Sequence, residues 1–181
     1  LEFMKLKLIA TTLVFLSVLS GCKKASEFTQ FTIEFDESVT IQSSVGINLP
    51  FDVLTPDMET NSDSKFESND TRKDMIEEIK LTKLNLTLTS PSSGDLSFLK
   101  SLDVFISADG LDEVRLAWVQ NVPESVGKFL ELSVEDFNFK EYIKKDDFQL
   151  RLKTVTDKAI TNDHELDIHS EFFVDAEILG L

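Results

Sequence analysis

The sequence predicts an all-β fold: a two-layer antiparallel β-sandwich, immunoglobulin-like in broad architecture, with about seven to nine strands and roughly one to three short connecting helices. Two observations carry this prediction. Apolar and polar residues alternate along most of the 181-residue chain, and a period of two is typical of strands and not of helices. Each alternating run offers only one apolar side, so the strands must pack in two layers to bury it.

The longest alternating run covers residues 39–53, where every odd position except Ser43 is apolar. Gly46 and Pro50 are expected to bend this segment or to divide it into two strands, because both residues weaken strand interiors. Within residues 79–88 the apolar positions change from odd to even, which predicts a β-bulge around Thr82–Lys83. The remaining alternating runs are Phe31–Phe35, Leu102–Ile106, Val114–Trp118, Leu130–Val134, Phe148–Leu152 and Leu166–Ile178, the last interrupted by Ser170.

Helical signals are sparse. Thr71 and Asp74 have the spacing of a weak capping box, which predicts a helix over residues 72–78. The polar residues 56–71 are interpreted as a long hairpin tip or a mobile loop. The other expected helical elements are a short helix capped by Asp136, with Phe139, Tyr142 and Ile143 on its inner side, and one turn at residues 95–99.

The charge and cysteine counts exclude several classes of protein. The chain has 33 acidic and 18 basic residues, and this balance argues against nucleic acid as a partner, because nucleic-acid binding depends on basic side chains. A single cysteine excludes an internal disulfide framework and any multi-cysteine zinc or iron–sulfur site. The hydrophobic content of 41% is sufficient for folding, and we expect one sandwich domain over residues 28–181.

The N-terminal segment has the order of features of a secretory signal. Residues 1–3 precede Met4 and are interpreted as a remnant of cloning, and residues 4–21 as a signal peptide. Two lysines precede an uncharged apolar stretch over residues 8–19. As a helix this stretch is roughly 18 Å long at about 1.5 Å per residue, too short for the ~30 Å hydrocarbon core of a bilayer. We therefore expect a transient signal and not a stable transmembrane span.

The sequence Leu19-Ser20-Gly21-Cys22 follows this apolar stretch. It resembles the lipobox of bacterial lipoproteins at all four positions, over about the first 22 residues of the chain. The resemblance implies that the signal is cleaved between Gly21 and Cys22, that the thiol of Cys22 carries a diacylglycerol group, and that the new N-terminus is acylated. Two or more acyl chains give durable membrane anchoring. An ordinary secretory signal and a cytosolic protein with an apolar N-terminus are the alternatives.

The same resemblance predicts the location of the protein. Residues 22–27 would form a lipid-anchored tether in the bacterial cell envelope. The residue after Cys22 is Lys23, whereas an Asp at this position resembles an inner-membrane retention signal. We therefore expect the protein in the outer membrane, with the sandwich facing the periplasm. Display on the cell surface is the second possibility. The covalent lipid on Cys22 is the only cofactor that we expect.

The acidic segment of residues 57–63 contains weak candidates for a metal site. Asp57, Glu59, Asn61 and Asp63 place oxygen ligands at alternate positions, as the start of a calcium loop does. Ser62 stands where that loop needs Gly, and Ser68 stands where it needs a bidentate Glu. These residues are weak metal candidates, and a solvated loop is the favoured interpretation.

The two histidines, His164 and His169, have an odd separation, so one extended strand would point them to opposite faces. His164 shares its parity with the apolar residues. His169 shares its parity with the acids of the last strand, where carboxylates should raise the pKa of its imidazole. A divalent-metal patch or a pH-responsive contact is the functional hypothesis for His169, and a solvated strand face is the simpler interpretation.

Catalytic signals are weak. The chain has no Gly-x-Ser-x-Gly motif, and its acidic pairs are adjacent in sequence, where strand side chains diverge. Phe173 and Trp118, together with His169, are candidates for a contact patch, although packing under a loop is the favoured interpretation for both aromatic residues.

These observations favour a noncatalytic binding or scaffolding module anchored in the envelope, with an envelope protein or ligand as its partner. The first alternative is a carrier of lipid or of a small apolar ligand, in which the sandwich opens into a pocket. The second alternative is a periplasmic metal-dependent hydrolase. Because no convincing set of catalytic residues is present, we expect no enzymatic activity.

Overall fold

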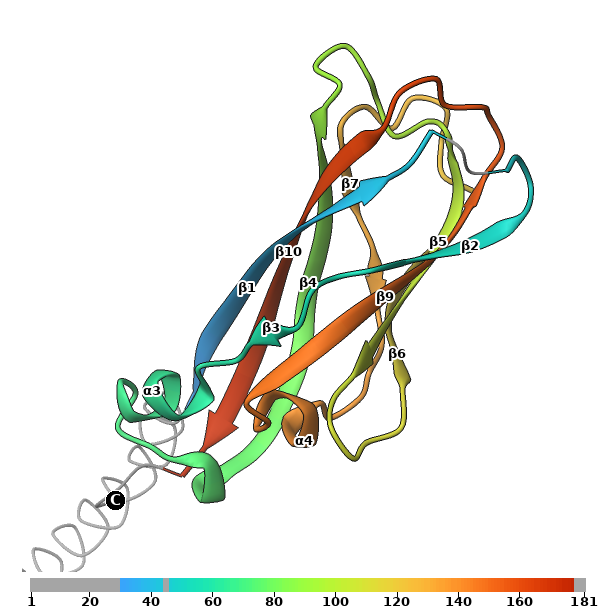
Figure 1. Ribbon diagram of the computed structural model, residues 1–181. Helices are drawn as coiled ribbons and strands as arrows, with labels where there is room; N and C mark the ends of the chain where they lie inside the picture. The colour runs from blue at the N-terminus through green and yellow to red at the C-terminus, as the bar shows by residue number, and fades with distance from the viewer. Residues whose placement is uncertain (1–29, 44–45, 178–181) are drawn as a thin grey trace, which may run out of the picture.

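The computed structural model describes residues 30–43 and 46–177, which form two antiparallel sheets packed face to face (Figure 1). The predicted β-sandwich is therefore confirmed. Seven strands have five residues or more, and three are shorter, so the described residues hold ten strands where about seven to nine were expected. Residues 1–29, with the predicted signal and Cys22, lie outside the described residues, as do Val45 and Ile178.

One sheet has four strands in the order β1-β10-β4-β7, and the other has six, in the order β2-β9-β5-β6-β8 with β3 also paired to β9. In the first sheet the strands are β1 (Gln30–Ile41), β10 (His164–Ala176), β4 (Ile76–Ser90) and β7 (Phe129–Glu131). In the second they are β2 (Pro50–Leu54), β3 (Met58–Glu59), β9 (Asp147–Thr156), β5 (Leu99–Ser107), β6 (Val114–Gln120) and β8 (Ser133–Val134). The helical elements are α3 (Ser62–Glu67), the 3₁₀ turn η2 (Lys73–Met75) and α4 (Lys140–Ile143). None of the helices in residues 30–43 and 46–177 is long and apolar enough to cross a membrane.

The two sheets are joined by aromatic side chains that meet between them. The ring of Phe35 on β1 makes edge-to-face contacts with Phe148 on β9 and Phe172 on β10, at centroid distances of 5.1 and 5.8 Å. Phe139, just before α4, contacts Phe172 from the end of the sandwich. All four rings are buried. Edge-to-face aromatic pairs contribute about 0.5–1.5 kcal/mol each beyond the area that they bury.

The predicted β-bulge is present in β4. Glu171 pairs with Lys83 and Phe172 with Leu81, which leaves Thr82 without a partner residue on β10. The Thr82 hydroxyl donates a hydrogen bond to the backbone oxygen of Glu171. Because the bulge absorbs one residue, the apolar residues on both sides of it stay in the core.

The long alternating run of residues 39–53 is divided, as expected, into β1, which ends at Ile41, and β2, which begins at Pro50. Ile47 and Leu49 lie between the two strands and are exposed, so the alternation there does not correspond to a strand face.

The interpretation of residues 56–71 as a hairpin tip or a mobile loop was wrong. The segment pairs with β9 through β3 and then forms α3, whose Phe66 is fully buried against Phe31. From the same helix, the ammonium group of Lys65 donates to the backbone oxygen of Glu34 and lies 3.6 Å from the centre of the Phe35 ring. Burial lowers the pKa of Lys65. The segment therefore covers the edge of β1, a strand with no neighbour on that side within the described sheets.

The prediction of a helix over residues 72–78 was also wrong. The backbone makes one 3₁₀ turn at Lys73–Met75 and then enters β4, because Ile76 and Ile79 both point into the core. The hydroxyl of Thr71 donates to the backbone oxygen of Glu177 instead of capping a helix.

The helix expected after Asp136 is present as α4, with Phe139, Tyr142 and Ile143 buried. Its first turn is held by Asn138, whose side-chain oxygen accepts a hydrogen bond from the backbone N–H of Lys140. Asp136 pairs with Lys80 instead of capping the helix. Residues 95–99 make a single turn closed by a bond from the Leu99 N–H to the Leu96 oxygen, as expected.

Phe66→Ala should lower the free energy of unfolding by about 3–5 kcal/mol, because it leaves a cavity under the segment that covers β1. Urea denaturation monitored by circular dichroism measures this change. The control is Glu67→Ala at the exposed neighbouring position, which should change the free energy by less than about 0.5 kcal/mol. An equally small effect of Phe66→Ala would show that the segment does not pack in solution as it does here.

On the outer face of the six-stranded sheet, Arg151 on β9 contacts side chains from neighbouring segments. Its guanidinium donates to both carboxylate oxygens of Glu113, at 2.8 and 2.5 Å, and to Asp52 on β2 at 2.7 Å. It also lies over the ring of Phe105 on β5. The hydrogen bonds from Arg151 lower the pKa of Glu113, and partial burial opposes this shift only in part.

Glu113→Gln should therefore have a pH-dependent effect on stability. Because the pKa of Glu113 is lower in the folded state, its contribution is present above the unfolded pKa, near 4.5, and is lost as the pH falls through the folded value. The difference in unfolding free energy between wild type and variant should be largest near neutral pH and shrink below about pH 4.5. Urea denaturation at a series of pH values measures it, with Glu67→Gln as the control, and a difference independent of pH would contradict the assignment.

Candidate functional site

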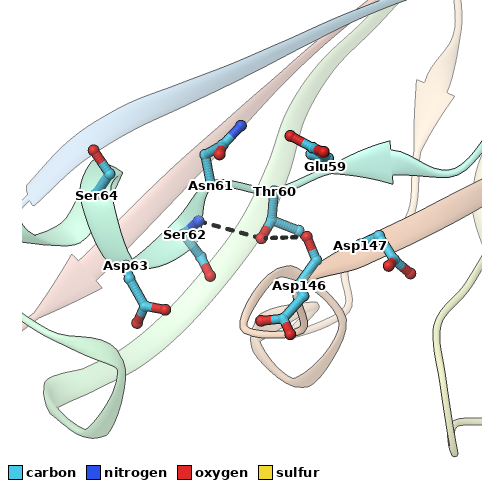
Figure 2. A pocket seen from close by; sticks show the side chains of 8 residues that line it. All are labelled: Glu59, Thr60, Asn61, Ser62, Asp63, Ser64, Asp146 and Asp147. Carbon is cyan, nitrogen blue, oxygen red and sulfur yellow. Dashed lines mark hydrogen bonds between the residues drawn. The ribbon is translucent and has the colours of Figure 1, made fainter.

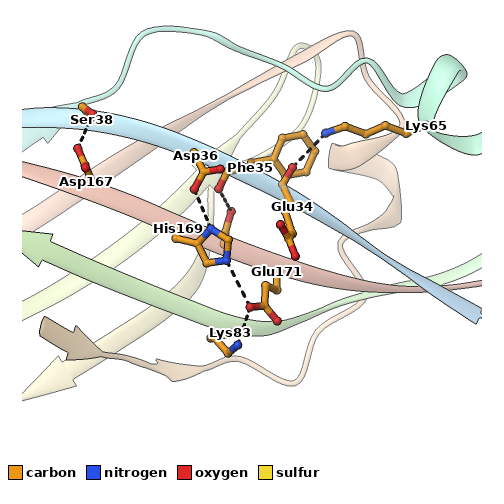
Figure 3. A network of polar contacts seen from close by, with 10 residues as sticks. Glu34, Phe35, Asp36, Ser38, Lys65, Lys83, Asp167, His169 and Glu171 are labelled. Carbon is orange, nitrogen blue, oxygen red and sulfur yellow. Dashed lines mark hydrogen bonds and ion pairs between the residues drawn. The ribbon is translucent and has the colours of Figure 1, made fainter.

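A cluster of charged side chains lies on the outer face of the four-stranded sheet, where β1 and β10 pair (Figure 3). In the register of these strands Asp36 lies opposite His169, and Glu34 lies opposite Glu171. All four side chains point away from the core, because the residues that alternate with them along each strand are buried.

His169 is held from both sides by carboxylates. Its Nδ1 lies 2.7 Å from Oδ1 of Asp36, and its Nε2 lies 3.3 Å from Oε1 of Glu171. The hydrogen bond with Asp36 is the main cause that raises the pKa of His169, as the sequence predicted, while burial partly opposes it. On β4, the ammonium group of Lys83 lies 2.5 Å from the same oxygen of Glu171 and lowers the pKa of that carboxyl.

Glu34, His169 and Glu171 each offer one potential ligand atom, and the three atoms lie within 4.8 Å of one another. Within residues 30–43 and 46–177, no other group of three His, Cys, Asp or Glu side chains converges as closely. The cluster is partly accessible: the side chains of His169 and Glu171 are 33% and 24% exposed, so a small solute can reach them.

His164 occupies the opposite face of the same strand and is buried, as its parity predicted. Its Nδ1 lies 2.8 Å from the backbone oxygen of Asn162, and its ring lies 4.5 Å from that of Phe98. The two histidines therefore do not approach one another as ligands.

The weak calcium candidates are only partly brought together. Glu59, Asn61 and Asp63 line a surface groove of about 380 Å³ at the end of the sandwich that carries α3 and α4, whereas Asp57 does not (Figure 2). The other residues that line the groove are Thr60, Ser62, Ser64, Asp146 and Asp147. The ammonium group of Lys73 lies 3.1 Å from Asp63 and 3.5 Å from Asp146, so two of the acids already share a cation.

Thr60 and Ser62 form the buried floor of this groove. The Thr60 hydroxyl donates to the backbone oxygen of Lys145 at 2.6 Å and accepts a hydrogen bond from the Ser62 N–H. The hydroxyl of Ser62 is buried and has no hydrogen-bond partner among the described residues.

Each of the acidic pairs that are adjacent in sequence, at residues 112–113, 135–136 and 146–147, has at least one member in an ion pair. Glu113 binds Arg151, and Glu135 binds Arg115, on the outer face of the six-stranded sheet. Asp136 and Asp146 are paired with Lys80 and Lys73, respectively.

The two aromatic candidates for a contact patch lie on different sheets. Phe173 is half-buried on the outer face of β10, where its parity placed it. Trp118 lies opposite Asp103 on the outer face of the other sheet, under the guanidinium of Arg115 at 4.5 Å. The alternating run Val114–Trp118 predicted that Trp118 faces the core with Leu116. This was wrong, because the pairing of β5 with β6 shifts by one residue and buries both Leu116 and Ala117. Phe173 and Trp118 therefore belong to separate surfaces.

Sequence reasoning identified His169 but not its partners from other strands. Glu34 and Asp36 alternate with buried Ile33 and Phe35, so their outward direction was predictable. Their position beside His169 was not, because it depends on the pairing of the first and last strands.

Comparisons with known proteins add no assignment. No protein-family model and no curated protein sequence matches the chain. Among solved structures, it is similar to a capsid structure of Helicobacter pylori bacteriophage KHP30, with 12% identity, a TM-score of 0.34, and coverage of 80% of this chain and 92% of that one. It is also similar to CpGH89CBM32-5 of Clostridium perfringens, solved in complex with GalNAc-β-1,3-galactose, with 8% identity, a TM-score of 0.37, and coverage of 80% and 97%. Similarities this low carry no argument about function.

Ser62→Ala should raise the free energy of unfolding by about 0.5–2 kcal/mol, because it removes a buried hydroxyl that has lost its hydration without gaining a protein partner. Thr60→Val is the comparison variant. It removes a buried hydroxyl that has hydrogen-bond partners, so it should destabilise the protein by about 1–3 kcal/mol. Urea denaturation of both variants measures the two changes. Destabilisation by Ser62→Ala would show that its hydroxyl is hydrogen-bonded in solution.

Proposed function

We propose that this chain is a lipid-anchored protein of the bacterial cell envelope, and that its β-sandwich is a noncatalytic binding or scaffolding module. The observation that carries the binding role is where the apolar and the charged side chains lie on the two sheets. Large apolar side chains fill the space between the sheets, and the described ion pairs lie on outer faces and at the ends. Any recognition by this domain would therefore take place on its surface.

The packing of the interior supports this role over that of a carrier. A lipid carrier needs an apolar cavity between the sheets, and the rings of Phe35, Phe148 and Phe172 contact one another in that space. A hydrolase needs a cleft with convergent polar groups. In the groove beside α3, three of the polar side chains are already engaged: Thr60 bonds to the backbone, and Lys73 bridges Asp63 and Asp146.

The anchor follows from the lipobox resemblance of Leu19–Cys22. Gln30, where β1 begins, follows Cys22 by eight residues, which at ~3.3 Å per residue span at most about 26 Å. The start of β1 lies at the same end of the sandwich as α3 and α4 (Figure 1). A lipid on Cys22 would thus hold this end near the bilayer and direct the opposite loops away from it.

Cys22→Ser should abolish both acylation and membrane association, because the thiol is the attachment point for the lipid. In bacteria expressing the full chain and given a labelled fatty acid, the wild-type protein should carry label and sediment with membranes, and the variant should do neither. Ser26→Ala, in the tether, is the control and should behave as the wild type. A Cys22→Ser protein that still incorporates the label and still sediments would refute the anchor.

A further inference from the structure

We propose that Glu34, His169 and Glu171 form a binding site for a divalent transition-metal ion of the zinc class, with Asp36 as the residue that orients His169. The site lies on the outer face of the four-stranded sheet, on the two strands that begin and end the described fold. The proposal goes beyond the binding role above and does not depend on the lipid anchor.

The spacing of the ligand atoms fits a small metal ion. Nitrogen and oxygen ligands lie about 2.0–2.2 Å from zinc, so two ligands of a tetrahedral site are about 3.4 Å apart. Nε2 of His169 and Oε1 of Glu171 are 3.3 Å apart. The carboxylate of Glu34 lies within 4.8 Å of both, on an exposed side chain that can rotate to complete the set.

Asp36 supplies the support that metal-binding histidines need. Such a histidine almost always donates its second ring N–H to a carboxylate or carbonyl oxygen, which fixes the ring and its tautomer. Here Nδ1 lies 2.7 Å from Oδ1 of Asp36. A neutral imidazole that donates through Nδ1 then turns the lone pair of Nε2 toward the carboxylate of Glu171. Two acceptors that face each other are stable only with a proton or a cation between them.

The charges around the cluster favour a cation. Glu34 and Glu171 are directly opposite in the strand register, an arrangement that is destabilising for two like charges. Asp36 adds a third carboxylate from β1, and Glu131 on β7 also acts on the neighbouring Lys83. Lys83 on β4 is the base bound to Glu171. The three carboxylates of Glu34, Asp36 and Glu171 outnumber the single ammonium group of Lys83 and leave a formal net charge of about −2, which one divalent ion neutralises.

The ligand types indicate which metal fits. An imidazole with carboxylates suits zinc and related first-row metals, whereas calcium takes about six to eight oxygen ligands. Three protein ligands leave at least one coordination position open to solvent.

The direct test is isothermal titration of zinc chloride into the full chain carrying Cys22→Ser, without a polyhistidine tag, so that neither the thiol nor a tag binds the metal. One zinc ion should bind per chain. His169→Ala should abolish binding, Glu34→Gln should weaken it, and Asp36→Asn should weaken it by about 10–100-fold. Circular dichroism confirms that each variant is folded; Glu34 and Asp36 are exposed, so their variants keep the test valid if His169→Ala fails to fold.

The matched control is Asp167→Asn. Asp167 lies on the same strand and face as His169, two residues away, and bonds to Ser38 (Figure 3). Its loss removes one negative charge but no ligand, so the affinity should fall by less than about fivefold. Lys83→Met should raise the zinc affinity, because it frees Glu171 and removes a nearby positive charge.

Nitrogen NMR of the imidazole separates coordination from general attraction to an acidic face. Zinc should shift the Nε2 resonance of His169 while Nδ1 remains protonated, and calcium chloride should shift neither. The proposal is overturned if the folded protein binds no zinc, if Asp167→Asn weakens binding as much as Asp36→Asn, or if calcium binds as tightly as zinc.

Discussion

The contact of Phe35 with Phe148 and Phe172 determines which faces of β1 and β10 are buried. It joins the edge strand of one sheet to a strand of the other and fixes the rotation of β1 about its own axis. Because side chains alternate along a strand, burial of Phe35 forces Glu34 and Asp36 to the outside. Burial of Phe172 on β10 likewise forces His169 and Glu171 to the outside. The charged cluster is thus a consequence of how the core is packed.

Register is the second constraint. A slip of one residue between paired strands would turn every side chain to the other face. The bulge at Thr82 absorbs one residue of β4, which keeps the leucines on both sides of it in the core and places Lys83 opposite Glu171. The cluster therefore gains its base from a third strand. It is also built on sheet and not on loops, so its geometry has the rigidity of the ladder that carries it.

The sequence predicted features that depend on neighbouring residues and missed those that depend on distant ones. Alternation identified the sandwich, the bulge at Thr82 and the outward position of His169, because each follows from a local period. Asp36, which contacts Nδ1 of His169, is 133 residues away in the sequence, and no local pattern contains that pairing. Residues 56–71 were misread because few of them are apolar; their order depends on the burial of Met58 and Phe66. The helix predicted from the capping-box spacing at Thr71 does not form. The burial of Ile76 at the start of β4 stabilises a strand more than the weak capping signal stabilises a helix.

A native mass spectrum of the protein extracted from bacterial membranes can test both the lipid anchor and the filled interior of the sandwich. We expect the mass of a chain that begins at Cys22 plus covalently attached acyl groups, with no lipid or other apolar ligand retained noncovalently in the gas phase. A chain that has the mass expected without acyl groups would contradict the anchor. A noncovalent lipid that stays bound to the folded protein would contradict the packed core and favour the carrier instead.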